Sequence, residues 1–328
     1  MEASEDSELC FPQLLNASCI RTKRPHYETL LTNIAVASVS LLTVFLNLLV
    51  IISISHFKQL HTPTNLLLLS LAVSDFLVGL LFFFQMMFID GCWFLGDLMC
   101  TVYQYLAYVI ASTSAGAMVL ISIDRYLAVC HPLLYSTQVT QTRAQLSVCL
   151  CWVCSLIFQT LNLQDVLQKP GRFNSCVGEC AFVINYVAGL ADLLFTFIVP
   201  IAVIMVLYVR VFVVAVGQAR AIRSHIAAVS LQRSGKVSRT SELKATRTLG
   251  VVIVVFLLCL SPYYCVALSG GDTLLNGSTA AFVLCLYYWN SCLNPLIYAF
   301  LYPWFKKSVQ FIVTCRILQP DSSAANVL

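Results

Sequence analysis

Long apolar stretches alternate with short polar segments along this chain, and that pattern predicts helices that cross a membrane. A transmembrane helix needs about 20 apolar residues. Stretches without Lys, Arg, Asp or Glu cover residues 29–55, 98–123, 144–164, 248–271 and 273–305. Two more stretches, 62–89 and 181–209, are equally apolar except for one acid each, Asp75 and Asp192. The pattern therefore predicts seven membrane-spanning helices.

Composition supports a membrane location. Of 328 residues, 59% are hydrophobic and only 10% are charged, which leaves too few polar side chains to cover a soluble protein of this size. Most Lys and Arg residues near the apolar stretches fall in segments that share one side, which the positive-inside rule makes cytoplasmic. The amino terminus is then outside the cell. We expect an all-α plasma-membrane protein, a seven-transmembrane helix bundle with an extracellular N-terminus.

The polar segments are short, so the chain divides simply. We expect an extracellular segment at 1–28, a transmembrane domain at 29–305, and a cytoplasmic part at 306–328 that begins with a short amphipathic eighth helix. The outer segments carry two glycosylation motifs, Asn16-Ala17-Ser18 and Asn276-Gly277-Ser278. We expect modification at Asn16. For Asn276, a modified and an unmodified side chain are equally expected, because its loop is short and close to the bilayer.

Six cysteines fall on the oxidising outer side, where disulfides persist: Cys10, Cys19, Cys92, Cys100, Cys176 and Cys180. Cys100 opens the third apolar stretch and Cys180 shortly precedes the fifth. A Cys100–Cys180 bridge would hold the second outer loop over the ends of the helices. The sequence leaves the pairing of the other cysteines open.

Polar residues inside apolar spans are costly, so they indicate function. Asp124-Arg125-Tyr126 ends the third span, Asn294-Pro295-Leu296-Ile297-Tyr298 lies near the end of the seventh, and single residues mark the others: Asn47, Asp75, Trp152, Pro200, Tyr208 and Pro262. This set resembles the rhodopsin-like receptors, which signal through heterotrimeric G proteins. The resemblance covers the whole transmembrane region.

A narrower resemblance lies in residues 290–305, which read NSCLNPLIYAFLYPWF. This frame, together with Cys10-Phe11-Pro12 and the outer loop SCVGEC at 175–180, is similar to the trace amine-associated receptors. That family ties its amino-terminal segment to this loop by an extra bridge. The resemblance implies Cys19–Cys176, with Cys10 as the competing partner.

At the inner ends of the spans, the motifs predict a switch. Arg125 is a cation at the membrane edge that needs a carboxylate. Asp124 is its neighbour, and we expect Glu242 to be its partner across the bundle. Glu242 lies 20 residues before Pro262, about 30 Å along the sixth helix, which places it at the level of Arg125. Outward motion of that helix would open a G-protein site, which Tyr208 and Tyr298 would stabilise. The alternative is that these charges only anchor helix ends.

A second polar group lies in mid-membrane. We expect oxygen atoms there to surround one sodium ion. The residues that would supply these oxygens are Asn47, Asp75, Ser114, Asn290, Ser291 and Asn294. The resemblance implies sodium as an allosteric modulator rather than a transported ion. The alternative is a network of hydrogen-bonded water.

The candidate ligand site departs from most amine receptors. They place an Asp on the third helix 18 residues before the Arg of the Asp-Arg-Tyr motif, and that position is Ala107 here. Asp192 instead lies eight residues before Pro200, roughly 12 Å further out on the fifth helix. Some trace amine-associated receptors, chiefly of bony fishes, resemble this chain in that they have lost the acid on the third helix and gained one on the fifth. The resemblance implies an amine held by Asp192 in an inverted pose.

Aromatic side chains complete the predicted ligand site through cation–π contacts: Tyr108, Tyr263, Tyr264, Tyr287 and Tyr288. The alternative for Asp192 is a carboxyl satisfied by neighbouring hydroxyls, without a ligand role. Leu260 is a second departure, because the family usually has Trp two residues before the proline of the sixth helix. Ligand binding would then move this helix through other side chains, such as Phe256 and Tyr264.

Other functions fit the sequence less well. A channel or transporter would use Asp75 and Asp192 as an ion path, but it gives the Asp-Arg-Tyr motif no role. No set of nucleophile, base and metal ligands converges, so we expect neither an enzyme nor a metal cofactor. We expect a protonated amine ligand, a stimulatory or olfactory G protein, membrane lipid, and no nucleic-acid partner. The alternative is a rhodopsin-like receptor for a non-amine ligand.

Overall fold

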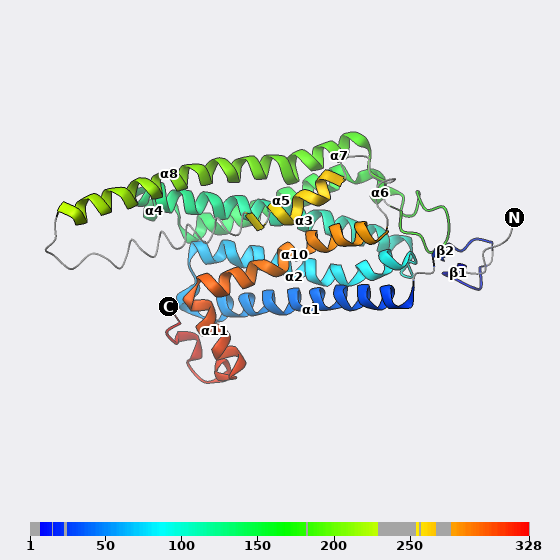
Figure 1. The fold of residues 1–328 in the computed structure, drawn as a ribbon, viewed down its shortest axis with the longest axis horizontal. Coiled ribbons are helices and arrows are strands. Elements are labelled where there is room, and N and C mark those ends of the chain that lie inside the picture. Colours follow the sequence, from blue (N-terminus) through cyan, green and yellow to red (C-terminus); the bar gives the residue numbers. More distant parts are fainter. Residues whose placement is uncertain are drawn as a thin grey trace.

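The computed structural model describes residues 7–14, 16–22, 25–181, 183–228, 254–255, 257–266 and 277–327. Its long helices lie side by side in one bundle (Figure 1). The amino-terminal segment lies at one end of the bundle, here called the hairpin end. Helix α11 lies at the other end, here called the α11 end.

Each predicted span contains a helix. The first four are α1 (His26–His56), α2 (Pro63–Asp90), α3 (Gly96–Cys130) and α5 (Gln141–Asn162), with short helices α4 (Pro132–Gln138) and α6 (Gln164–Gln168) beside them. The sixth span is described over Leu257–Val266, and the seventh is α10 (Gly277–Leu301). By length and composition, 5 helices in the described part of the chain are sufficient to cross a membrane.

The fifth span is a continuous helix with an irregular centre. It consists of α7 (Tyr186–Asp192), a π-helical segment η2 (Leu193–Ile198) and α8 (Val199–Ala228). It begins at Tyr186 because the Asn185 side chain caps it by accepting a hydrogen bond from the Val187 N–H. A π-helical turn often occurs at functional sites. Here it follows directly after Asp192.

The end of the seventh apolar stretch differs from the prediction. The apolar stretch 273–305 contains two helices, because α10 ends at Leu301 and α11 (Pro303–Val313) begins at a proline. Proline lacks a backbone N–H and restricts the residue before it, so it starts a helix more readily than it continues one. In α11, Trp304, Phe305 and Ser308 are buried, while Lys306 and Lys307 are exposed. The cytoplasmic position of this helix stays a prediction.

The amino-terminal segment is the exception to the expected all-α fold. Strands β1 (Ser7–Leu9) and β2 (Ile20–Thr22) pair antiparallel, with Ser7 opposite Thr22. Two short strands form a marginal hairpin in water. Apolar periodicity gave no sign of it, because each strand has only three residues.

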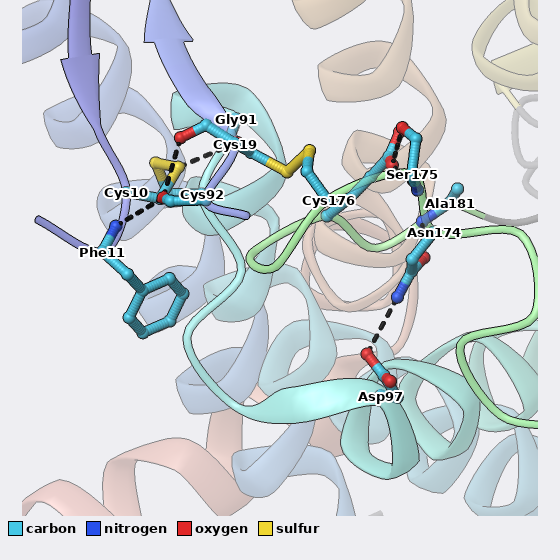
Figure 2. Close-up of a disulfide and its surroundings, with 12 residues drawn as sticks. Cys10, Phe11, Cys19, Gly91, Cys92, Asp97, Asn174, Ser175, Cys176 and Ala181 are labelled. Atoms are coloured by element: carbon cyan, nitrogen blue, oxygen red, sulfur yellow. Dashed lines mark hydrogen bonds between the residues drawn. A yellow bond between two sulfur atoms is a disulfide. The ribbon is translucent and has the colours of Figure 1, made fainter. Parts of the chain in front are cut away.

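Disulfides hold this hairpin against the bundle. The structure contains the two expected pairs, Cys100–Cys180 and Cys19–Cys176, and a third, Cys10–Cys92, that the sequence left open. Figure 2 shows the hairpin cysteines beside Cys92 and Cys176. Cys10 is therefore bonded to Cys92, two residues after the end of α2, and does not compete for the second outer loop.

Hydrogen bonds strengthen this connection. The Cys19 N–H donates to the Val177 carbonyl at 2.9 Å, and the Val177 N–H donates to the Ala17 carbonyl at 2.7 Å. Within the loop, the Ser175 hydroxyl and backbone N–H donate to Glu179, both at 2.6 Å. These two hydrogen bonds lower the pKa of the Glu179 carboxyl, and the bond from the hydroxyl contributes more than the bond from the backbone N–H. The loop at 175–180 is thus held by hydrogen bonds to the amino-terminal segment and by hydrogen bonds within the loop itself.

Close packing sets the positions of the helices. Helices α1 and α2 approach at Gly79, where an added Cβ would lie 2.9 Å from Val44 Cγ2 and 3.0 Å from the Val44 backbone nitrogen. The Ser40 hydroxyl donates to the Gly79 carbonyl at 2.6 Å. Weak packing forces and small residues typically join helices in this way within a bilayer.

Candidate functional site

A cavity of about 190 Å³ opens among the spans, toward the hairpin end. It is lined by residues of α2, α3, the fifth span, the sixth span and α10. All six predicted ligand residues line it: Ala107, Tyr108, Asp192, Tyr263, Tyr264 and Tyr288. The sequence reasoning thus placed these residues, which come from four different spans, around one cavity.

Asp192 is buried, with an exposed fraction of 8%. Its Oδ1 accepts hydrogen bonds from Gln159 Nε2 at 2.8 Å and from the Thr196 hydroxyl at 3.1 Å. Both donors are neutral, and both act on Oδ1. The expected alternative, a carboxyl satisfied by a neighbouring hydroxyl, is therefore partly present at Oδ1.

Gln159 is a site residue that the sequence reasoning missed. It lies on α5, its side chain has an exposed fraction of 0%, and its Oε1 has no partner among the described residues. An uncharged polar residue in the apolar stretch 144–164 was the available signal, because intramembrane polar groups find partners inside the bundle. Gln159 holds Asp192 in place without neutralising it.

Aromatic rings form a connected series around the cavity. Phe197 stacks on Tyr264 with ring centroids 4.0 Å apart, and Tyr263 lies 5.3 Å from Tyr264 and 4.9 Å from Tyr287. Tyr288 continues the series at 5.4 Å from Tyr287. Ring faces carry partial negative charge, so they attract a cation that enters the cavity.

A second polar pair lines the cavity from α2 and α3 and was also missed. The Tyr103 hydroxyl donates to Gln85 Oε1 at 3.0 Å, and both residues line the cavity. Gln85 is a polar residue in the apolar stretch 62–89, a signal of the same kind as Gln159. Ala107 presents only a methyl group on this side. The cavity therefore has an acid at one wall and neutral hydrogen-bonding groups at another.

The polar core beneath the cavity brings together the predicted sodium ligands. Asn294 Nδ2 donates to Asp75 Oδ2 at 2.8 Å, and the Ser114 and Ser291 hydroxyls also interact with this carboxyl. Four buried oxygens have no hydrogen-bond partner among the described residues: Asn47 Oδ1, Asp75 Oδ1, Asn290 Oδ1 and Asn294 Oδ1. Acceptors without donors are the environment that a hard cation requires, so the residues fit sodium.

At the α11 end, Arg125 is held in a compact network. Its Nε donates to Asp124 Oδ2 at 2.9 Å, and its Nη2 also contacts that oxygen and donates to the Thr64 hydroxyl at 2.7 Å. The Tyr135 hydroxyl donates to Asp124 Oδ1 at 3.0 Å. Asp124 is thus the observed partner of Arg125. Thr64 and Tyr135 are network residues that the sequence reasoning did not include.

The structure describes only some of the remaining residues that the sequence singled out for the switch, for glycosylation and for motion of the sixth helix. Glu242, Asn276 and Phe256 lie outside the described residues, as does the side chain of Tyr298. The Tyr208 hydroxyl is buried without a hydrogen-bond partner in the described part of the chain, and the Tyr126 hydroxyl contacts His131 at 3.2 Å. Pro295 lies inside α10, and Asn16 is exposed. Glycosylation of Asn16 stays a prediction.

Comparison with known proteins agrees with this architecture. Residues 46–298 match the family model of the 7 transmembrane receptors of the rhodopsin family. The chain is 35% identical to trace amine-associated receptor 13c of Danio rerio, over 98% of this chain and 97% of that protein. It is 36% identical to trace amine-associated receptor 6 of Pan troglodytes over 98% and 95%, and 36% identical to trace amine-associated receptor 1 of Mus musculus over 86% and 88%.

Proposed function

This chain belongs to the trace amine-associated receptors, within the rhodopsin family of seven-transmembrane receptors, and we propose that it detects protonated amines at Asp192. Members of this family are multi-pass plasma-membrane receptors, not enzymes, that respond to small molecules and couple to G proteins. The proposal concerns the ligand class, the residues that bind it and the route by which binding acts on the G protein.

The observation that carries the proposal is a buried carboxylate, on the wall of an aromatic cavity, whose hydrogen-bond donors among the described residues are neutral. A buried charge is expensive unless a counter-charge meets it. Gln159 and Thr196 bind Oδ1 of Asp192, which leaves Oδ2 for an ammonium group. Because Ala107 supplies no acid on α3, the ammonium would bind toward the fifth span. The rest of the ligand would then extend toward α2 and α10.

Signal transfer would begin at the sixth span. Tyr263 and Tyr264 line the cavity from this helix, and Tyr264 packs on Phe197 of the fifth span. A ligand held between these rings and Asp192 changes the contacts between the two helices. Motion of the sixth helix away from α3 would release the Arg125 network and open a site for the G protein. A stimulatory or olfactory G protein is proposed from the family resemblance.

Sodium would act as a modulator in the polar core. Asp75, Asn294 and Asn290 would hold the ion with the hydroxyls of Ser114 and Ser291, supported by the unpartnered oxygens there. A sodium ion supplies a positive charge that compensates the buried carboxylate of Asp75. Its ligands come from α2, α3 and α10, so it would favour the closed arrangement of these helices.

The test is a cAMP reporter in cells that express the wild type, Asp192→Asn or Asp165→Asn, exposed to a panel of protonated amines. Asp165 is an exposed acid outside the cavity and serves as the matched control. Loss of one member of a buried charge pair costs about 3 kcal/mol or more, so Asp192→Asn should raise the half-maximal concentration at least about 100-fold. Surface expression is measured for every variant.

Two results would contradict the proposal. An unchanged response in surface-expressed Asp192→Asn would remove this residue from ligand binding. A wild type that answers no amine, in cAMP or in the other G-protein readouts, would favour a receptor for a non-amine ligand.

A further inference from the structure

A pair of neutral polar side chains lines the ligand cavity toward the hairpin end. Gln85 comes from α2 and Tyr103 from α3. Their exposed fractions are 7% and 6%, so both hydrogen-bonding groups are buried among the spans. Polar groups at such positions are costly, and ligand sites typically use a few of them to fix the orientation of a ligand. We call these two residues the Gln85–Tyr103 pair.

The hydrogen bonds of this pair run in one direction. The Tyr103 hydroxyl donates to Gln85 Oε1 at 3.0 Å, and the Tyr288 hydroxyl interacts with the Tyr103 hydroxyl. Because a tyrosine hydroxyl has one proton, Tyr103 is a donor toward Gln85 and an acceptor toward Tyr288. Gln85 Nε2 carries two N–H donors, and no acceptor among the described residues bonds to them. The series therefore ends at donors that a ligand can use.

A neutral oxygen suits these donors better than a second ammonium group does. Among the described residues that line the cavity, Asp192 alone carries a charge. An ammonium group is a donor without acceptor capacity. Beside Gln85 Nε2 it would lose its water without gaining a counter-charge. A hydroxyl oxygen can instead accept a hydrogen bond from Gln85.

Helix α3 provides the path from Asp192 to Gln85. It packs against both α2 and the fifth span. Tyr103, Ala107 and Ala111 follow one another at intervals of four residues, so they lie along one face of α3, and all three line the cavity. Ala107 and Ala111 present only methyl groups, which suit an apolar chain between two polar ends. A ligand held by Asp192 can therefore extend along this face to the Gln85–Tyr103 pair.

We propose that the Gln85–Tyr103 pair is a distal subsite for a neutral oxygen, so that this receptor prefers amines with a hydroxyl group at the far end of the molecule. The inference rests on the proposed anchoring of the amine at Asp192. A hydrogen bond between neutral groups raises affinity by about 2- to 10-fold. A ligand hydroxyl that is buried without its partner loses about 5- to 150-fold.

The probes are 5-aminopentan-1-ol, hexylamine and 1,5-diaminopentane, which match in length and end in a hydroxyl, a methyl and an ammonium group. Analogues one CH₂ shorter and one CH₂ longer are included, so that chain length does not decide the result. Concentration–response curves for cAMP are recorded for the wild type, Gln85→Met and Tyr103→Phe. The measured quantity is the ratio of the half-maximal concentrations of the alcohol and the alkylamine of equal length. Effects on expression or on the amine anchor cancel in this ratio.

Two exposed residues outside the cavity provide matched controls. Gln168 lies on α6 and Tyr186 begins α7, and neither lines the ligand cavity. Gln168→Met and Tyr186→Phe therefore make the same chemical changes away from the site. Asp192→Asn is measured with the same probes, and surface expression is quantified for every variant.

The wild type and both control variants should respond to the alcohol at a concentration about 2- to 10-fold lower than to the alkylamine, with the diamine weakest. Gln85→Met should shift the ratio toward the alkylamine by at least about 5-fold, because methionine has the length of glutamine but no N–H donor. Tyr103→Phe should shift it in the same direction, because the Gln85 amide loses the bond that orients it. If Gln85→Met fails to reach the surface, Tyr103→Phe decides the question.

A wild type that answers the alkylamine at least as well as the alcohol, at every chain length, would overturn the inference. The same follows if neither variant of the pair changes the ratio, or if the diamine is more potent than the alcohol. In these cases the proposed function survives, provided that Asp192→Asn still abolishes the response. If Asp192→Asn leaves every curve unchanged, the amine anchor itself is wrong, and the distal subsite with it.

Discussion

Replacing Thr64 with Val should raise the activity of the receptor in the absence of ligand. Thr64 lies near the start of α2, and its hydroxyl accepts from Arg125 Nη2 at 2.7 Å and donates to Asp124 Oδ2 at 3.0 Å. Valine has nearly the same shape but no hydroxyl. The substitution therefore removes a polar bridge between α2 and α3 without creating a cavity.

The size of the effect follows from these contacts. Arg125 Nη2 would lose a partner and keep its contact with Asp124, and Asp124 would keep its bonds from Arg125 and Tyr135. The Thr64 hydroxyl also contacts the Tyr135 hydroxyl at 3.0 Å, and the substitution removes this contact and the bond to Asp124 as well. The largest single loss is the hydrogen bond from the charged donor Arg125, which is worth about 1.5–3 kcal/mol. That corresponds to a shift of roughly 10- to 150-fold toward the open form. A receptor that is about 1% open would become roughly 10–60% open.

The assay is ligand-free cAMP, normalised to receptor at the cell surface. Thr137→Val is the matched control, because Thr137 is exposed on α4 at the same end of the bundle and its hydroxyl donates to the nearby Leu134 carbonyl of the same helix. Basal signalling should rise in Thr64→Val and not in Thr137→Val. Equal basal signalling in both variants, at normal surface levels, would show that the Thr64 bridge does not stabilise the closed form.

Three further predictions concern other parts of the molecule. Asp75→Asn should abolish the change in amine potency that follows replacement of extracellular sodium by potassium, and a persisting sodium effect would place the ion elsewhere. Gly79→Ala should lower the free energy of unfolding in detergent by about 1–3 kcal/mol because of overpacking. Gly189→Ala, whose added Cβ meets no atom within 4 Å, should change it little. Replacing Cys10 and Cys92 together with Ser should make the amino-terminal segment more sensitive to limited proteolysis, and equal cleavage rates would argue against the third disulfide in cells.

Much of the fold could be predicted because the bilayer imposes simple rules. Backbone groups in lipid must be satisfied within each helix, so apolar length alone identified the spans. Costly polar residues, such as Asp75, Asp192 and Arg125, then marked the sites. The structure places the predicted ligand residues around one cavity, although they lie far apart in the sequence.

The parts that could not be predicted depend on contacts between distant residues. Gln159 and Gln85 are single polar residues, and nothing in the sequence says which acid or hydroxyl each one meets. The Cys10–Cys92 bridge depends on where a short hairpin lies relative to the end of α2.

The central claim is that Asp192 holds the ligand's ammonium group. The most direct test is an experimental structure of the receptor with the most potent amine of the panel bound. We predict an amine nitrogen within hydrogen-bonding distance of the Asp192 carboxylate, with Gln159 still donating to Oδ1. An ammonium group that lies against α3 or at the hairpin end, with no contact to Asp192, would contradict the account.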